Sequence, residues 1–199
     1  SEEFDGDSID TSVWSFDTGG GGWGNWELQN YVPSAATVAD GWLTITAAKQ
    51  PDGSYTSARM KTQGNFAWTY GRVRARIRLP YEQGVWPAFW MLGEDITTVG
   101  WPSCGEIDIM ELFGTRLGAT AHSVVHTPLA HGGNVGHLDA SHPLPDLAHG
   151  ALSNPHVWEM RWTADTVRVF IDDAKIFEYA REGGSHSRMA DRAQWPFDG

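Results

Sequence analysis

The chain has 199 residues, which is enough for one domain with a sizeable core and short for two. Its 14 Lys and Arg against 25 Asp and Glu give a formal net charge of −11, so a polyanion such as DNA would be repelled over most of the surface. No apolar run approaches the roughly 18 residues of a membrane span, and the single cysteine, Cys104, excludes an intrachain disulfide. We therefore expect one domain over residues 1–199, with neither nucleic acid nor a membrane as its partner.

Short alternating segments separated by turn residues run along most of the chain, which is the pattern of an all-β protein. Residues 72–79 alternate charged and apolar side chains and end at Pro80, so they predict a strand with one buried face and one face exposed to solvent. No window keeps a helical stripe over 12 or more residues. A sandwich of two sheets is the natural architecture for such elements. The predicted strands are residues 43–47, 72–79, 157–162, 167–171 and 175–179.

Residues 127–156 interrupt this pattern. They contain Pro, Gly, Asn, Asp and five of the eight His, with little alternation of polar and apolar residues. A long segment without regular structure usually has a function or is mobile. We expect loops that border a binding face.

Three carboxylates, Glu106, Asp108 and Glu111, lie within six residues of an apolar strand. Glu106 and Asp108 are two apart and share a face of the strand, whereas Glu111 would point to the opposite face. One extra residue at 109–110, a β-bulge, would return Glu111 to the face of the other two. Ile107 and Ile109 then face the core. We predict this bulge.

Aligned carboxylates repel one another unless one of them is protonated. Retaining glycosidases need such a set, because one ionised carboxylate is the nucleophile and a second, protonated one is the acid. Asp108 between them can hydrogen-bond the nucleophile. The same residues would also be compatible with a merely hydrated strand face or with a cation site.

Aromatic residues, above all the 11 Trp, provide surfaces on which the apolar faces of sugar rings stack. Any one of these Trp could equally belong to the core. Asn25 and Arg59 by themselves suit a turn or the surface as well as a binding site. His122, His126 and His131 do not form a helical zinc motif, so we expect no catalytic metal, and His126 is a candidate for contact with the substrate or the acid/base group. The Trp candidates for a sugar site are Trp23, Trp26, Trp86, Trp90 and Trp101.

The segment EIDIME at residues 106–111 resembles the active-site signature of glycoside hydrolase family 16 in its bulged, laminarinase-like form. Further segments resemble that family in the family's order, so the resemblance covers almost the whole chain. They are WGNWELQNY at 23–31, SARMKT at 57–62, YGRVRARIRLP at 70–80, WPAFWML at 86–92, VWEMRW at 157–162 and WPFD at 195–198.

This resemblance implies a β-jelly roll, a sandwich of two antiparallel sheets, with a substrate cleft across its concave sheet. It implies Glu106 as nucleophile, Asp108 as its assisting neighbour and Glu111 as acid/base. It also places six residues in or near the cleft, and the bulged form is more typical of β-1,3-glucanases than of lichenases. The six are Asn25, Arg59, Trp86, Trp90, Trp101 and His126.

Family members commonly bind a structural Ca²⁺, and Glu3 and Gly41 resemble two of its ligands. Relatives continue beyond the WPFD segment with strands that complete both sheets, whereas this chain stops at Gly199. We therefore expect a domain that lacks its C-terminal strands and is completed by a C-terminal fragment, a strand-swapped copy or a longer natural chain.

The sequence thus favours a retaining endo-glycoside hydrolase that cleaves a laminarin-type β-1,3-glucan by double displacement, without a catalytic cofactor. Two alternatives stay open. The same chemistry would serve mixed-linkage glucan, galactan or algal galactan, and a glucan-binding lectin could use the same fold, although such relatives lose the carboxylates kept here. Because polymeric glucans are extracellular, we expect a secreted protein.

Overall fold

The computed structural model describes residues 1–80, 82–115, 118–129, 136–142, 154–181 and 193–198. The chain forms two compact units, Ser1–Ala67 and Trp68–Gly199. The expectation of one domain over residues 1–199 remains a prediction. No helix within the described ranges has the length and apolar character needed to cross a membrane.

The first unit is built of short strands in three small sheets. Two of the sheets are antiparallel, and the third combines a parallel pair, β2 with β6, with an antiparallel one, β6 with β5. The tight turn at Asp40 and Gly41, both with positive φ (53° and 75°), joins β3 to β4. The elements are β1 (Ser15–Asp17), β2 (Gln29–Tyr31), the 3₁₀ turn η1 (Pro33–Ala35), β3 (Ala36–Ala39), β4 (Trp42–Ile45), β5 (Ala48–Lys49), β6 (Tyr55–Ser57) and β7 (Arg59–Lys61).

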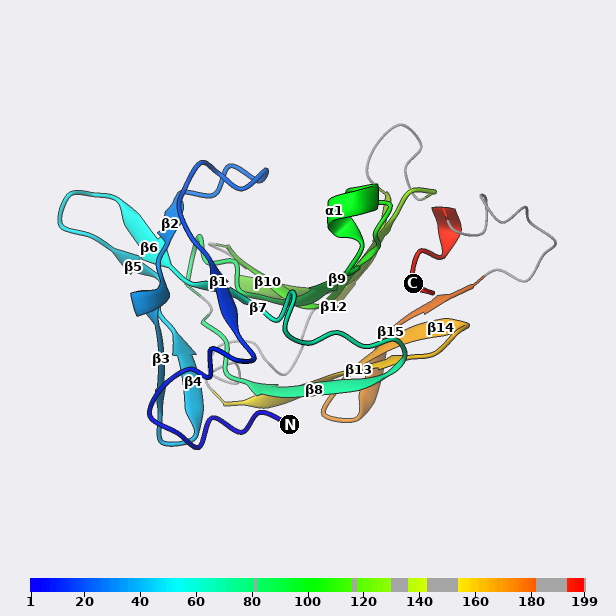
Figure 1. Cartoon of the computed structure of the whole chain (residues 1–199), viewed down its shortest axis with the longest axis horizontal. Helices are drawn as coiled ribbons and strands as arrows, with labels where there is room; N and C mark the ends of the chain where they lie inside the picture. Colours follow the sequence, from blue (N-terminus) through cyan, green and yellow to red (C-terminus); the bar gives the residue numbers. More distant parts are fainter. Residues whose placement is uncertain (81, 116–117, 130–135, 143–153, 182–192, 199) are drawn as a thin grey trace. The chain divides into compact units, whose positions relative to one another are not determined.

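The second unit is a sandwich of two antiparallel four-stranded sheets, as Figure 1 shows. One sheet has the order β12-β11-β10-β9, and the other has the order β15-β14-β13-β8. The all-β jelly-roll prediction is confirmed. Its elements are β8 (Gly71–Ile77), β9 (Ala88–Leu92), the short helix α1 (Ile96–Val99), β10 (Glu106–Thr115), β11 (Gly118–Thr127), β12 (Gly136–His142), β13 (His156–Trp162), β14 (Thr166–Ile171) and β15 (Ala174–Ala180).

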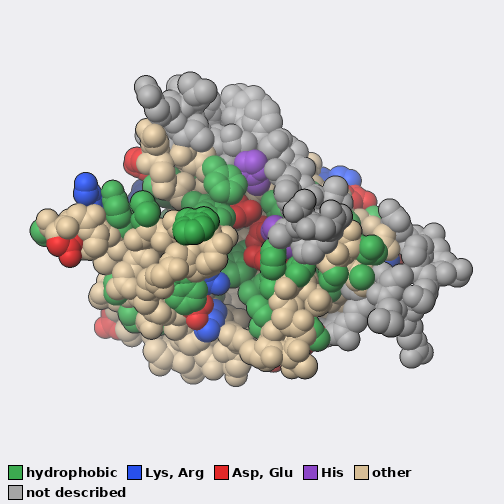
Figure 2. Space-filling view, turned by 90° about the horizontal axis from the view of Figure 1, so that it is seen from above, with side chains coloured by type: hydrophobic (Ala, Val, Ile, Leu, Met, Phe, Trp, Pro, Cys, Tyr) green, Lys and Arg blue, Asp and Glu red, His purple; other side chains and the backbone are tan. Residues whose placement is uncertain are grey.

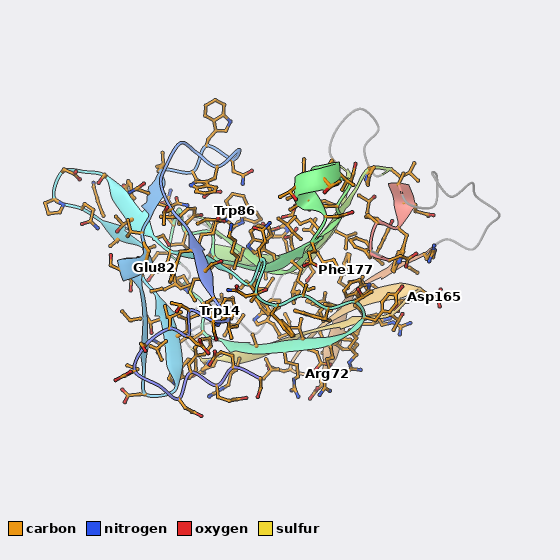
Figure 3. The ribbon with its side chains drawn as sticks, in the orientation of Figure 1. Trp14, Arg72, Glu82, Trp86, Asp165 and Phe177 are labelled. Atoms are coloured by element: carbon orange, nitrogen blue, oxygen red, sulfur yellow. The ribbon has the colours of Figure 1, made fainter. Side chains whose placement is uncertain are left out.

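The core of the second unit lies between its two sheets, because each strand turns alternate side chains inward. Ile107 and Leu112 of β10 meet Trp158 and Met160 of β13, and all four are almost completely buried. Figure 3 places Phe177 of β15 between the sheets. Burying such side chains contributes roughly 1.5–3 kcal/mol each, which is the main force holding the two sheets together.

The expectation of loops over residues 127–156 is partly wrong. Residues 136–142 form β12, which pairs with β11 so that His126 is opposite His137 and Val124 is opposite Asp139. Small residues hide the alternation of this segment, and its strand depends on hydrogen bonds to β11 rather than on its own propensity. The stretches 130–135 and 143–153 lie outside the described residues.

Candidate active site

The bulge in β10 determines which side chains reach the outer face of its sheet. The register of β10 shifts between Asp108 and Glu111 against β11, and between Asp108 and Met110 against β9. Ile109 and Met110 are both buried, at 0% and 2% exposure, so two successive residues are directed inward. The predicted bulge is confirmed, and the three carboxylates follow on one face of the strand.

A glycine lies directly before the first residue of β10. Gly105, directly before Glu106, has a φ of 75°, which side chains other than glycine rarely adopt. A Cβ at Gly105 would also lie 2.8 Å from the ring of Phe197. The position therefore allows only glycine, and the backbone turns sharply just before the first carboxylate.

Glu106 is half-buried and accepts a hydrogen bond of 2.5 Å from the indole N–H of Trp101. Burial raises the pKa of Glu106 from 4.5 to about 7, and the charges of Asp108 and Glu111 act in the same direction. The electrostatic contribution of His126 and the Trp101 hydrogen bond oppose that rise in the pKa of Glu106. Glu106 is thus a carboxyl group that changes its protonation near neutral pH.

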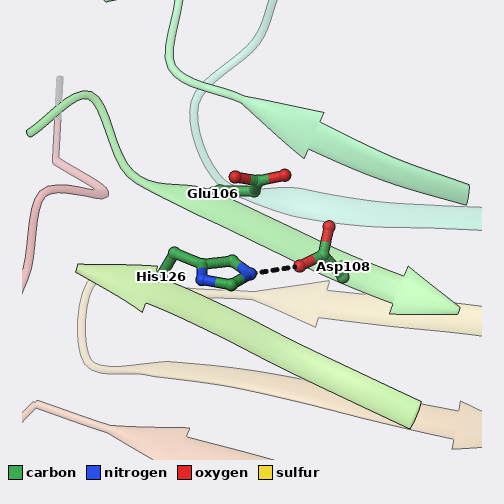
Figure 4. A group of neighbouring side chains, drawn as sticks. All are labelled: Glu106, Asp108 and His126. Atoms are coloured by element: carbon green, nitrogen blue, oxygen red, sulfur yellow. Dashed lines mark ion pairs between the residues drawn. The ribbon is translucent and has the colours of Figure 1, made fainter. Parts of the chain in front are cut away.

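Asp108 is 4% exposed and lies next to both Glu106 and His126. Burial raises the pKa of Asp108 well above its ordinary value, and the charge of Glu111 adds to that rise. Nε2 of His126 lies 3.0 Å from Oδ2 of Asp108, although that oxygen takes part in no well-aligned hydrogen bond. Figure 4 marks this contact with a dashed line.

The third carboxylate has aromatic surroundings of its own. Oε1 of Glu111 accepts a hydrogen bond of 2.8 Å from the indole N–H of Trp86. The Trp86 ring is 5.2 Å from that of Phe113, and Phe113 meets the ring of His122 edge-on at 5.0 Å. Because His122 is also the cross-strand partner of Glu111, these side chains surround one carboxylate.

The predicted residues of the second unit come together around the three carboxylates. His126 is the cross-strand partner of Glu106, and its ring is 5.7 Å from that of Trp101. Trp90 of β9 is the cross-strand partner of Asp108. Figure 2 shows the resulting surface, where acidic side chains and histidines lie among hydrophobic ones.

Phe113 and His122 are functional candidates that the sequence did not single out. Phe113 lies two residues after Glu111 on the same strand face, so the alternation of β10 contained the signal. His122 carried no comparable signal, because its position opposite Glu111 depends on the register of β11.

The remaining predicted residues belong to the first unit. Asn25 donates a hydrogen bond of 3.2 Å to Glu27, and Arg59 forms an ion pair of 3.0 Å with Asp17. Glu3 is exposed in the N-terminal segment, and Gly41 lies in the turn between β3 and β4. Their roles in binding the substrate or calcium remain predictions.

One carboxylate or imidazole atom from each of Glu106, Asp108 and His126 lies within 4.8 Å of the others. Such a donor set is compatible in type with a divalent cation. It consists of the same groups that form the acid–base cluster, so a cation would neutralise the carboxylates on which proton transfer depends.

Similar proteins identify the family to which this chain belongs. The model of glycosyl hydrolases family 16 matches residues 25–195. A β-glucanase of Rhodothermus marinus is 39% identical over 213 residues, covering 100% of this chain and 70% of that protein. A glucan endo-1,3-β-glucosidase of Cryptopygus antarcticus is 35% identical over 184 residues, covering 86% of this chain and 65% of its own length.

A solved structure supports the same relationship. The laminarinase of Flavobacterium sp. UMI-01 superposes with a TM-score of 0.84 at 36% identity, covering 99% of this chain and 81% of that one. Sequence and fold therefore agree over nearly the full chain, which belongs to glycosyl hydrolases family 16.

Proposed function

We propose that this glycoside hydrolase is a retaining endo-β-1,3-glucanase acting on laminarin-type polysaccharide. The relatives named above as β-glucanase, endo-1,3-β-glucosidase and laminarinase support this substrate class. The observation that carries the proposal is the bulged strand β10, whose three carboxylates lie on one face with a tryptophan N–H donated to the first and another to the third.

The proposed mechanism has two displacements. In the first, an ionised oxygen of Glu106 attacks the anomeric carbon while the bond to the leaving sugar breaks, and Glu111 gives its proton to the leaving oxygen. In the second, Glu111, now ionised, takes a proton from a water molecule, and that water attacks the anomeric carbon and releases Glu106. The two inversions together retain the β configuration.

Asp108 serves this cycle by holding a proton. As the most buried carboxyl group of the three, it is the one for which ionisation costs most, because burial and the charge of Glu111 raise its pKa well above the ordinary value. The indole N–H of Trp101 reaches Glu106. This donor favours the ionised nucleophile although its surroundings are largely dehydrated.

The test is turnover and stereochemistry on defined polysaccharides. Laminarin, lichenan, galactan, agarose and carrageenan are each incubated with the wild-type protein and with Glu106→Gln, and the anomeric configuration of the first products is followed by NMR. We expect β products from laminarin and no turnover by the variant. Inverted products, or a variant that keeps more than a few per cent of the activity, would contradict the mechanism.

A second candidate function, a glucan-binding lectin, is disfavoured by the same site. A lectin has no use for a carboxyl group whose pKa is raised to about 7 beside two others. Binding of laminarin without any new reducing ends would nevertheless support it.

Two further expectations belong to this proposal. We infer a secreted protein, because its polymeric substrate does not enter cells. We also infer a structural Ca²⁺ that uses Glu3 and Gly41, since an exposed carboxylate and a turn carbonyl are the oxygen ligands that Ca²⁺ prefers.

A further inference from the structure

The outer face of the sheet β15-β14-β13-β8 carries a cluster of cationic side chains. On β8, Val73 and Ile77 pack against the core, while the arginines between them are exposed. Figure 3 shows Arg72 on the outer side of that strand. We call this surface the basic face, and it consists of Arg72, Arg74, Arg76, Arg161, Arg168 and Lys175.

The charge of the basic face is opposite to that of the protein. Its four strands carry these six cations and only two carboxylates, Glu159 and Glu178, which leaves an excess of four positive charges. The whole chain has a net charge of −11. Six of the 14 Lys and Arg of the chain thus lie on one sheet face.

The register of the strands brings arginines together. Arg161 is the cross-strand partner of Arg72 on one side and of Arg168 on the other, so three arginines form a row across neighbouring strands. The strands of a sheet lie about 4.8 Å apart, and like charges directly opposite each other are destabilising. The row therefore costs stability unless anions balance it.

Among the described residues, Glu159 and Glu178 supply part of that balance. Glu159, whose side chain is 3% exposed, lies 2.9 Å from Arg74, 2.5 Å from Arg161 and 4.0 Å from Arg72. One buried carboxylate thus serves three guanidinium groups. Glu178 is shared in the same way between Arg168, at 3.0 Å, and Lys175, at 2.5 Å.

The guanidinium groups are held in place yet remain accessible. The Arg161 guanidinium lies 4.0 Å from the centre of the Phe170 ring, and stacking of this kind fixes its plane. The side chains of Arg72, Arg161 and Arg168 are 59%, 46% and 41% exposed. Each guanidinium has five N–H donors, so the inner ones can bind Glu159 or Glu178 while the outer ones face the solvent.

We propose that the basic face binds an anionic polysaccharide through its carboxylate or sulfate groups. Arginine recognises both groups through paired N–H donors, and the row of three matches a chain with repeated charges. The face lies on the opposite side of the sandwich from Glu106, so an acidic polymer bound there leaves the catalytic face of this unit free. It would hold the enzyme in a matrix that mixes acidic and neutral polymers.

Other polyanions fit this face less well. Phe170 is 8% exposed, so its ring is not available for insertion into a lipid interface. The face also lacks an exposed aromatic ring among its described residues on which a nucleic-acid base could stack.

Binding is measured with polygalacturonate and dextran sulfate as probes and neutral dextran as the reference, by affinity electrophoresis and calorimetry at low salt. We expect one or both polyanions to bind, with an affinity that falls as salt is added. Arg72→Gln combined with Arg168→Gln should weaken that binding about tenfold or more. Lys49→Gln, which removes a cation from the first unit, should bind as the wild type does.

Three outcomes would overturn the proposal: neither polyanion binds, the double arginine variant binds them as tightly as the wild type, or anionic vesicles or duplex DNA bind in their place. Circular dichroism confirms that the variants are folded. Laminarin hydrolysis is measured separately with bound polyanion, so that failure of the glucanase proposal leaves the result for the basic face intact.

Discussion

The indole N–H of Trp86 donates a hydrogen bond of 2.8 Å to Glu111, from a position 25 residues earlier in the chain. Trp101 does the same for Glu106 at 2.5 Å. Each proposed catalytic carboxyl group therefore has one tryptophan donor that directs its oxygen atoms. In an enzyme that works through oriented carboxylates, we expect these two rings to act as positioning residues, and their contact with sugar rings remains a prediction.

Replacing Trp86 by Phe keeps an aromatic ring but removes the N–H donor to Glu111. We expect kcat on laminarin to fall about tenfold or more, because hydrogen bonds to charged groups contribute about 1.5–3 kcal/mol. KM should change less than kcat, since the ring that a sugar would contact is still present. Trp42→Phe in the first unit is the matched control, and a normal kcat for Trp86→Phe would show that the hydrogen bond has no catalytic role.

The roles of the two glutamates can be separated by azide, a small nucleophile. In Glu111→Ala the glycosyl-enzyme still forms on Glu106, so azide should attack it and give a β-glycosyl azide from an activated substrate. In Glu106→Ala, azide should replace the missing nucleophile and give the α-glycosyl azide. NMR of the products decides, and the opposite pair of configurations would mean that we have exchanged the two roles.

The raised pKa of Glu106 predicts how stability depends on pH. Its value of about 7 in the folded protein lies above the 4.5 of an unperturbed group, so the folded state binds the proton more tightly than the unfolded state does. The free energy of unfolding should therefore fall as the pH rises from 4.5 to about 7, by up to about 3 kcal/mol from this group.

Glu106→Gln removes that ionisation. We expect its Tm to exceed that of the wild type at pH 8 and to differ little at pH 4. Thermal unfolding followed by circular dichroism at both values provides the measurement. An equal Tm difference at the two values would show that Glu106 does not titrate in this range.

The linkage preference follows from the bulged strand if this chain behaves as the relatives named laminarinase do. Hydrolysis of laminarin should exceed that of barley mixed-linkage glucan when reducing ends are counted under identical conditions. Faster hydrolysis of lichenan or agarose than of laminarin would reject the β-1,3-glucan assignment. It would not affect the proposed two-carboxylate mechanism.

Calcium should affect stability rather than catalysis. We expect EDTA to lower the Tm of the wild type and added Ca²⁺ to restore it, with a much smaller response in Glu3→Ala, because a bound ion stabilises the folded state in proportion to the logarithm of its concentration. Exposed Glu2→Ala is the neighbouring control. A Tm that is insensitive to both EDTA and Ca²⁺ would remove this site.

Much of the catalytic strand could be predicted from sequence alone, because its evidence is local. Side chains alternate with a period of two, so counting along residues 106–111 was enough to place Glu106 and Asp108 on one face and to require a bulge for Glu111. Alternation likewise predicted β8, β13, β14 and β15. The function, by contrast, was predicted mainly from the resemblance to the family.

The neighbours of these residues were decided by tertiary structure. His126 meets Asp108, and His122 stands opposite Glu111, only because β11 pairs with β10 in one particular register. In the same way, pairing of β8, β13 and β14 aligns Arg72, Arg161 and Arg168. A one-residue slip of either pairing would turn these side chains to the other face. The sequence determined which residues could do the chemistry, whereas long-range strand pairing and burial decided which of them meet and which carboxyl group keeps its proton.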